Sequence, residues 1–154
     1  MNQLVERLSQ LVVDSRDRYV RLVLLVGEHD AGKTEVLSEF AADSSEQILC
    51  VGSSLTERLI GEPVRQRPVI ANDAFGDLLR DAASSDSVLV DNIEVLFLPS
   101  LQLDPLKLLQ DSARNRTVVA CWPGTIVNQD LFYGGNGHPD SRVFHSPDAL
   151  LLAI

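Results

Sequence analysis

The sequence has few cysteines and no excess of basic charge. Cys50 and Cys121 stand at the ends of predicted strands, with no second cysteine or histidine at metal-ligand spacing. We therefore expect two reduced core thiols, and neither a disulfide framework nor a zinc site. The net charge is −9, from 13 lysines and arginines against 22 aspartates and glutamates. This acidity disfavours a DNA-wrapping role for the chain.

Long apolar runs are also absent. No stretch approaches the about 20 apolar residues that cross a bilayer, and residues 1–7 are too polar for a signal peptide. We therefore expect a cytoplasmic protein without membrane contact. The 154 residues are 45% apolar and 23% charged, which is enough for one domain with a full core. A local basic cluster, Arg58, Arg65 and Arg67, is available to a partner's acidic patch or to a neighbouring subunit's nucleotide.

The chain does contain alternating helical and strand patterns. Residues 1–20 hold an amphipathic helix over 3–13 and a lead-in, and residues 21–154 form the predicted core. Strands are predicted at 21–26, 47–51, 87–91 and 117–121, and helices at 34–42, 53–60, 71–83 and 104–113. Weaker signals mark a loop at 61–68, helix at 93–98, a short piece at 131–133, a turn at 134–137, and strand or helix at 149–154. Ser53 or Ser54 is expected to cap the second core helix, and Asp104 the last. This order predicts a three-layer α/β/α sandwich with a mostly parallel sheet of about five strands.

The strongest motif begins where the first predicted core strand ends. An apolar run leads into Gly27-x-x-x-x-Gly32-Lys33-Thr34, the G-x-x-x-x-G-K-[ST] pattern of a phosphate-binding loop, with helical residues after it. Residues without a Cβ let this backbone wrap a polyphosphate with its N–H groups inward. Lys33 offers a cation to the β- and γ-phosphates, and the Thr34 hydroxyl offers a ligand to Mg²⁺. The sequence therefore predicts ATP and Mg²⁺ as ligands.

Nine consecutive residues are the predicted nucleotide contacts. They are Gly27, Glu28, His29, Asp30, Ala31, Gly32, Lys33, Thr34 and Glu35. The acids Glu28 and Asp30 are tolerable beside a polyanion only when they point away from it, since the loop binds through its backbone.

A second motif ends the apolar strand predicted at 87–91. Asp91 fits the aspartate that helps to hold Mg²⁺, and its separation from Lys33 leaves room for helix, strand and helix. That spacing suits the class of sheet in which another strand lies between the two motif strands. Asn92 stands where a glutamate usually positions the attacking water, and an amide cannot take a proton. Glu94 is the nearest carboxylate. Lys33, Asp91, Asn92 and Glu94 are thus the predicted catalytic residues, with hydrolysis expected to be weak or partner-dependent.

Four further residues are candidates either for sensing the γ-phosphate or for supplying positive charge to it. Thr125 follows the fourth core strand, where related folds carry a polar sensor; Trp122 nearby is the alternative, as a packing residue. Arginines that an adjacent subunit of a homo-oligomer offers to the phosphates are expected among Arg114, Arg116 and Arg142. The alternative for each arginine is a solvated surface position.

Several strings beyond the phosphate loop carry a family resemblance. They are Val90-Asp91-Asn92-Ile93-Glu94, Val119-Ala120-Cys121-Trp122-Pro123-Gly124, Leu131-Phe132-Tyr133 and Gly137-His138-Pro139-Asp140. With the leading helix, they resemble the BrxF-like small P-loop proteins of type 3 bacteriophage-exclusion (BREX) defence systems. The resemblance implies an ATP-binding, AAA+/ASCE-like core without a helical lid. It also implies work beside a methyltransferase and larger ATPase or helicase subunits.

Three other functions remain open at this point. A small P-loop kinase needs a lid over the phosphates, and 61–68 with Arg65 and Arg67 is the stretch available. A non-hydrolysing scaffold that senses ATP is compatible with Asn92. A GTPase is disfavoured, because Asp73-Ala74-Phe75-Gly76 matches D-x-x-G but no N-K-x-D motif occurs in the sequence. Whether the chain contacts DNA directly stays open.

Overall fold

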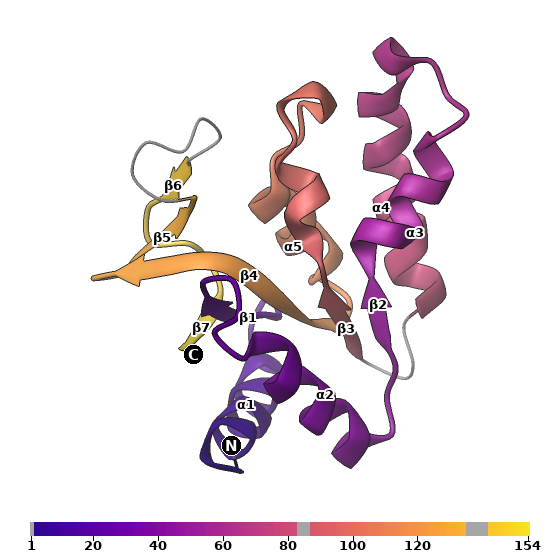
Figure 1. Ribbon diagram of the computed structural model, residues 1–154. Helices are drawn as coiled ribbons and strands as arrows, with labels where there is room; N and C mark the ends of the chain where they lie inside the picture. The colour runs from indigo at the N-terminus through magenta and orange to yellow at the C-terminus, as the bar shows by residue number, and fades with distance from the viewer. Residues whose placement is uncertain (1, 83–86, 135–141) are drawn as a thin grey trace.

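A computed structural model describes residues 2–82, 87–134 and 142–154 (Figure 1). Its helices are α1 (Asn2–Ser15), α2 (Lys33–Ser44), α3 (Val51–Leu59), α4 (Arg67–Ala82) and α5 (Pro105–Ser112), with 3-10 turns η1 (Val64–Gln66), η2 (Ile93–Phe97) and η3 (Pro99–Leu101). Its strands are β1 (Leu22–Gly27), β2 (Ile48–Cys50), β3 (Ser87–Asp91), β4 (Thr117–Val127), β5 (Asp130–Tyr133), β6 (Arg142–Phe144) and β7 (Leu150–Ala153). No helix in these ranges is long and apolar enough to span a membrane.

The sheet has seven strands, of which five run parallel in the order β2-β3-β4-β1-β7. The remaining two, β5 and β6, continue antiparallel from the far half of β4. β4 therefore lies between β1 and β3, as the spacing of the two sequence motifs predicts. The final apolar run is a strand, because Leu150 to Ala153 pair with Val23 to Val26 of β1.

Helices cover both faces of the parallel sheet, and the side chains of β1 point alternately to the two faces. Leu22, Leu24 and Val26 face one apolar core, which they share with α3, α4 and α5. Val23 and Leu25 face a second core, shared with α1 and α2. Figure 1 shows these two helical layers on opposite sides of the strands. All six residues of β1 are buried, as expected for a central strand covered twice. The predicted α/β/α sandwich is confirmed.

Several predicted boundaries are wrong. α3 begins at Val51 with Cys50 as its N-cap and no side-chain cap bond, so neither Ser53 nor Ser54 caps it. The helix starts early because β2 ends at Cys50, where its pairing with β3 stops. α4 begins at Arg67, which shortens the predicted loop at 61–68.

The last part of the chain agrees only in places with the predictions. Asp104 caps α5, since its Oδ1 accepts the Lys107 N–H at 3.2 Å. The predicted 93–98 helix is the 3-10 turn η2. Of the predicted 134–137 turn, only Gly134 lies among the described residues, with φ 75°. The end of the predicted 71–83 helix, Ala83, also lies outside them.

β4 does not stop at Cys121, as the sequence suggests, but continues for six residues to Val127. Its first half pairs with β1 and β3, and its second half forms a hairpin with β5. Trp122 lies where the two halves of β4 join. Its ring packs edge-on against the rings of Phe97 and Phe144, with centroid distances of 5.1 Å and 5.4 Å. Its Nε1–H donates to the Phe132 carbonyl at 3.1 Å. Trp122 is thus a fully buried packing residue.

Gly124 lies on β4 directly against the backbone of β5. A Cβ built at this position would collide with the Phe132 carbonyl, the same group that accepts the Trp122 bond. We predict that Gly124→Ala lowers the free energy of unfolding by about 1–3 kcal/mol, the usual cost of overpacking. Urea denaturation followed by Trp122 fluorescence measures the change.

Gly76→Ala is the matched control for this substitution. Gly76 lies within α4 and has open space around its Cβ position, so alanine there should stabilise the helix by about 1 kcal/mol. Equal stability of Gly124→Ala and the native chain would contradict the close approach of the two strands.

Candidate functional site

The phosphate loop joins the carboxyl end of β1 to the start of α2. A Cβ on Gly27 would meet Ala31 Cβ at 3.1 Å, Lys33 Cγ at 3.3 Å and Ile154 Cβ at 3.4 Å, so a side chain at this position would be crowded. Gly32 caps α2 in the left-handed region with φ 104°, a conformation strained for residues with a Cβ. Within the loop, the Ala31 N–H donates to the Glu28 carbonyl at 3.1 Å. The left-handed backbone therefore favours glycine at position 32, and close packing favours it at position 27.

Lys33 folds back over its own loop. Its ammonium donates to the Gly27 carbonyl at 2.7 Å and to the Glu28 carbonyl at 2.8 Å. The side chain thus crosses the loop, with its charge bonded to neutral acceptors. Phosphate oxygens are stronger partners for an ammonium than peptide carbonyls, because a charge-assisted hydrogen bond gains more energy.

A direct hydrogen bond joins the two sequence motifs. The Thr34 hydroxyl donates to Asp91 Oδ2 at 2.9 Å, and the Asn92 N–H donates to Asp91 Oδ1 at 2.8 Å. Asp91 is only 9% exposed, and among the ion pairs of the described residues none involves it. A buried carboxylate beside a hydroxyl fits Mg²⁺, a hard ion that uses one or two carboxylates and keeps several waters.

Two cavities meet at this loop. The first, of about 140 Å³, is lined by His29, Asp30, Ala31, Gly32, Lys33, Thr34, Glu35, Asp91, Asn92, Glu94 and Cys121. The second, of about 360 Å³, shares His29, Lys33 and Glu94 with the first and is bordered on one side by the β4–β5 hairpin. Thr125, the predicted sensor, lines this second cavity from the hairpin. Both cavities therefore open onto the same lysine and the same carboxylate.

The predicted acidic neighbours of the phosphates are at the surface. Glu28 is exposed and borders the second cavity, while the Asp30 side chain is 87% exposed and lies 3.4 Å from His29 Nε2. Glu94 is also exposed, in the first turn of η2. Of the three carboxylates, only Glu94 borders both cavities.

Cys50 lies next to the site and contacts Asn92, one of the residues that line it, whereas the sequence analysis places Cys50 in the core. It pairs in register with Asp91, and its Sγ accepts a hydrogen bond from Asn92 Nδ2 at 3.0 Å. Asn92 itself takes a left-handed conformation, φ 56° and ψ 55°, which turns its amide toward β2. The thiol thus sets the direction of the side chain that follows the motif aspartate. The sequence holds one sign of this position: Cys50, like Asp91, comes at the carboxyl end of a predicted strand, and such ends gather at one edge of a parallel sheet.

The thiols of Cys50 and Cys121 differ in acidity. Hydrogen bonds from Ser53 and then Asn92 lower the pKa of Cys50. Burial, together with the nearby Asp91 carboxylate, raises the pKa of Cys121 far above its usual range. Cys50 is therefore the thiol that ionises more readily.

The three predicted finger arginines line neither cavity. Arg114 lies 3.7 Å from Asp111 and stacks over Tyr19, and Arg116 donates to the Leu79 carbonyl at 3.2 Å. Both precede β4, at the amino end of the strands, whereas the loop lies at the carboxyl end. Arg142 donates to the carbonyls of Leu103 at 2.9 Å and Phe97 at 3.4 Å, which ties β6 to the η2–η3 segment. A role for any of them in a second subunit stays a prediction.

The described geometry defines the class of fold. A phosphate loop between β1 and α2, with the second motif on β3 and with β4 between β1 and β3, is the arrangement of a P-loop-like α/β/α sandwich.

Comparison with known proteins adds little to this assignment. No protein-family model and no curated protein matches the chain. A solved structure of C. elegans PCH-2 aligns with a TM-score of 0.45 and 18% identity, covering 82% of this chain. The chain spans 39% of the length of that structure.

The difference in thiol acidity is open to a direct test. We predict that iodoacetamide modifies Cys50 well before Cys121 at neutral pH, because only the thiolate reacts. Ser53→Ala and Asn92→Ala each remove a bond that lowers the pKa of Cys50, so each should move the pH midpoint of its alkylation upward. Peptide mass spectrometry over a pH series measures both sites.

The same reaction in urea is the control, since unfolding should abolish the difference between the thiols. Equal rates in the folded protein, or an unchanged midpoint in both variants, would show that the bonds to Cys50 do not form.

Proposed function

We propose that this chain binds ATP with Mg²⁺ and hydrolyses it slowly. The observation that carries the proposal is the 2.9 Å bond between Thr34 and Asp91, which brings together oxygen ligands from two distant motifs. Beside it lie the glycine-containing loop and a lysine with no carboxylate partner among the described ion pairs. These are the parts that phosphoryl transfer requires for binding and charge stabilisation.

The residues have distinct roles in this proposal. The loop backbone from Gly27 to Gly32 holds the phosphates, and Lys33 exchanges its two carbonyl acceptors for β- and γ-phosphate oxygens. Magnesium held by Thr34 and Asp91 would neutralise the charge on those oxygens. Glu94 is the group that accepts the proton of the attacking water, since the Asn92 amide can only orient it.

We further propose that the chain works as a homo-oligomeric ATPase subunit of a bacterial anti-phage system of the BREX type, in the cytoplasm. The support is the family resemblance of the sequence strings together with the position of the arginines. Among the described residues no arginine lines the two cavities, and in this proposal the positive charge that often completes phosphoryl transfer comes from another copy or a partner. The methyltransferase and the larger ATPase or helicase subunits are the partners that the resemblance suggests.

A small-molecule kinase is the second candidate function. The cavity of about 360 Å³ beside Lys33 and Glu94 has room for an acceptor molecule. The segment 61–68, which the sequence suggests as a lid, lies instead at the tip of the α3–α4 hairpin, far from the loop in Figure 1. ADP release that depends on an added acceptor would favour the kinase over the ATPase.

Lys33→Ala tests the binding site. We expect it to raise the Kd for ATP–Mg²⁺ by about tenfold to one hundredfold. This is the change in affinity that the loss of one charge-assisted hydrogen bond produces. Isothermal titration calorimetry measures the affinity, and circular dichroism verifies the fold. Lys107→Ala is the matched control, because Lys107 pairs with Asp111 on α5 and lines neither cavity. Unchanged affinity in Lys33→Ala would refute the site.

Turnover between subunits predicts a dependence on protein concentration. Phosphate release per subunit should rise as the chain is concentrated, in step with the mass measured by light scattering. A constant rate from a monomer would rule out a shared site. Binding of ATP with no phosphate release at any concentration, alone or with the partner subunits, would instead identify an ATP-sensing scaffold.

A further inference from the structure

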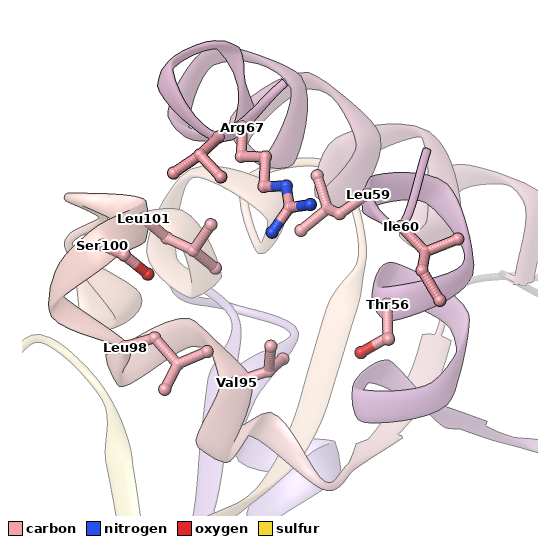
Figure 2. Close-up of a pocket in the computed structure, with 9 residues that line it drawn as sticks. Thr56, Leu59, Ile60, Arg67, Val95, Leu98, Ser100 and Leu101 are labelled. Atoms are coloured by element: carbon pink, nitrogen blue, oxygen red, sulfur yellow. The ribbon is translucent and has the colours of Figure 1, made fainter. Parts of the chain in front are cut away.

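A third cavity, of about 190 Å³, lies apart from the nucleotide site. It is formed by α3, by η1 with the start of α4, and by the η2–η3 segment, and we call it the α3–α4 cavity. Figure 2 shows the lining residues arranged around a common space: Thr56, Leu59, Ile60, Arg67, Val95, Leu98, Ser100 and Leu101. Val64 completes the lining. It shares no residue with the two cavities at the phosphate loop.

The rim of this cavity exposes large apolar side chains. Ile60 is 76% exposed, Val64 is 64% exposed and Leu98 is 46% exposed, whereas Leu59 and Leu101 at the base are buried. Scattered exposed apolar residues are ordinary, but several around one hollow mark a binding surface. About 190 Å³ suits one leucine- or phenylalanine-sized side chain.

A single charged group reaches into this apolar hollow. The Arg67 side chain enters from the start of α4, and its guanidinium points between Leu59 and Leu101 in Figure 2. Its Nε donates to the Glu62 carbonyl at 3.0 Å, which fixes the planar group. Among the ion pairs of the described residues none involves Arg67. A half-buried guanidinium gains most from a carboxylate, which it can meet with two parallel hydrogen bonds.

The surrounding charge favours an acidic partner. The segment 56–67 carries Arg58, Arg65 and Arg67 against two glutamates, in a chain whose net charge is −9. This is the basic cluster that the sequence singles out, and the nucleotide site does not use it. A positive spot on an acidic protein steers an acidic ligand to this place and away from the rest of the surface.

We propose that the α3–α4 cavity binds an acidic amphipathic helix of a partner protein. One large apolar side chain of that helix fills the hollow between Leu59, Val95 and Leu101. A carboxylate one turn away meets the Arg67 guanidinium, because residues three or four apart share a helix face. Val95 of the cavity directly follows Glu94 of the nucleotide site, so the bound helix contacts the segment that carries Glu94.

The probe for this site is a fluorescein-labelled synthetic peptide of about 16 residues, long enough to form a helix. It is alanine-based and carries leucine and glutamate four positions apart on one face. Two matched peptides replace the glutamates by lysine, or the leucines by alanine. Fluorescence anisotropy at low salt measures the binding of each to the full chain in the absence of nucleotide.

We expect the leucine–glutamate peptide to bind and both matched peptides to bind at least about tenfold more weakly. Arg67→Gln and Leu98→Ser should each weaken the first peptide by about five- to tenfold. Arg80→Gln is the control variant, since Arg80 lies on α4, pairs with Asp77 and lines a different cavity. Thermal unfolding verifies that the variants fold.

Three results would overturn the proposal. The first is no binding of the leucine–glutamate peptide up to about 1 mM. The second is equal binding of the lysine peptide or equal binding by Arg67→Gln, which would indicate a merely sticky surface. The third is a dimer in light scattering that Ile60→Asp dissociates, which would identify a second copy of the chain as the occupant.

Discussion

The placement of β4 between β1 and β3 is the constraint on which the rest of the structure depends. Because β4 pairs with both motif strands, the phosphate loop after Gly27 and the carboxylate of Asp91 come to the same edge of the sheet. The Thr34–Asp91 bond forms only at this edge. Parallel strands gather their carboxyl ends, and so place loops from separate parts of the chain around one ligand.

The continuation of β4 beyond the parallel sheet shapes the same site. Trp122 is buried among aromatic rings where the two halves of β4 join. Gly124 lets β5 lie close enough for the Phe132 carbonyl to accept the Trp122 indole N–H. The β4–β5 hairpin therefore borders the second cavity opposite Lys33, and it carries Thr125. The second cavity is thus bounded by this hairpin on one side and by Glu28, His29 and Lys33 of the phosphate loop on the other.

The 3-10 turn η2 links two surfaces that are otherwise separate. Glu94 borders both nucleotide cavities, and the next residue, Val95, lines the α3–α4 cavity. Ile93, Leu96 and Phe97 on the same turn are buried in the core and hold it in place. A ligand on Arg67 and Leu98 therefore acts on a short, well-packed segment. This continuity gives a physical route by which the proposed helix would affect the position of the Glu94 carboxylate beside the phosphate loop.

The sequence by itself determined the features that depend on local order along the chain. The glycines, lysine and threonine of the loop are consecutive, so their pattern is readable without a fold, and apolar runs identify β1, β3 and the helices of the sandwich. Even the strand between the motifs follows from their spacing. Pairing between distant strands decided the rest. Cys50 meets Asn92 only because β2 lies beside β3, and β4 continues through Pro123 only because β5 and the Trp122 packing support it. Such contacts join residues far apart in sequence, and no local pattern encodes which distant group a side chain will meet.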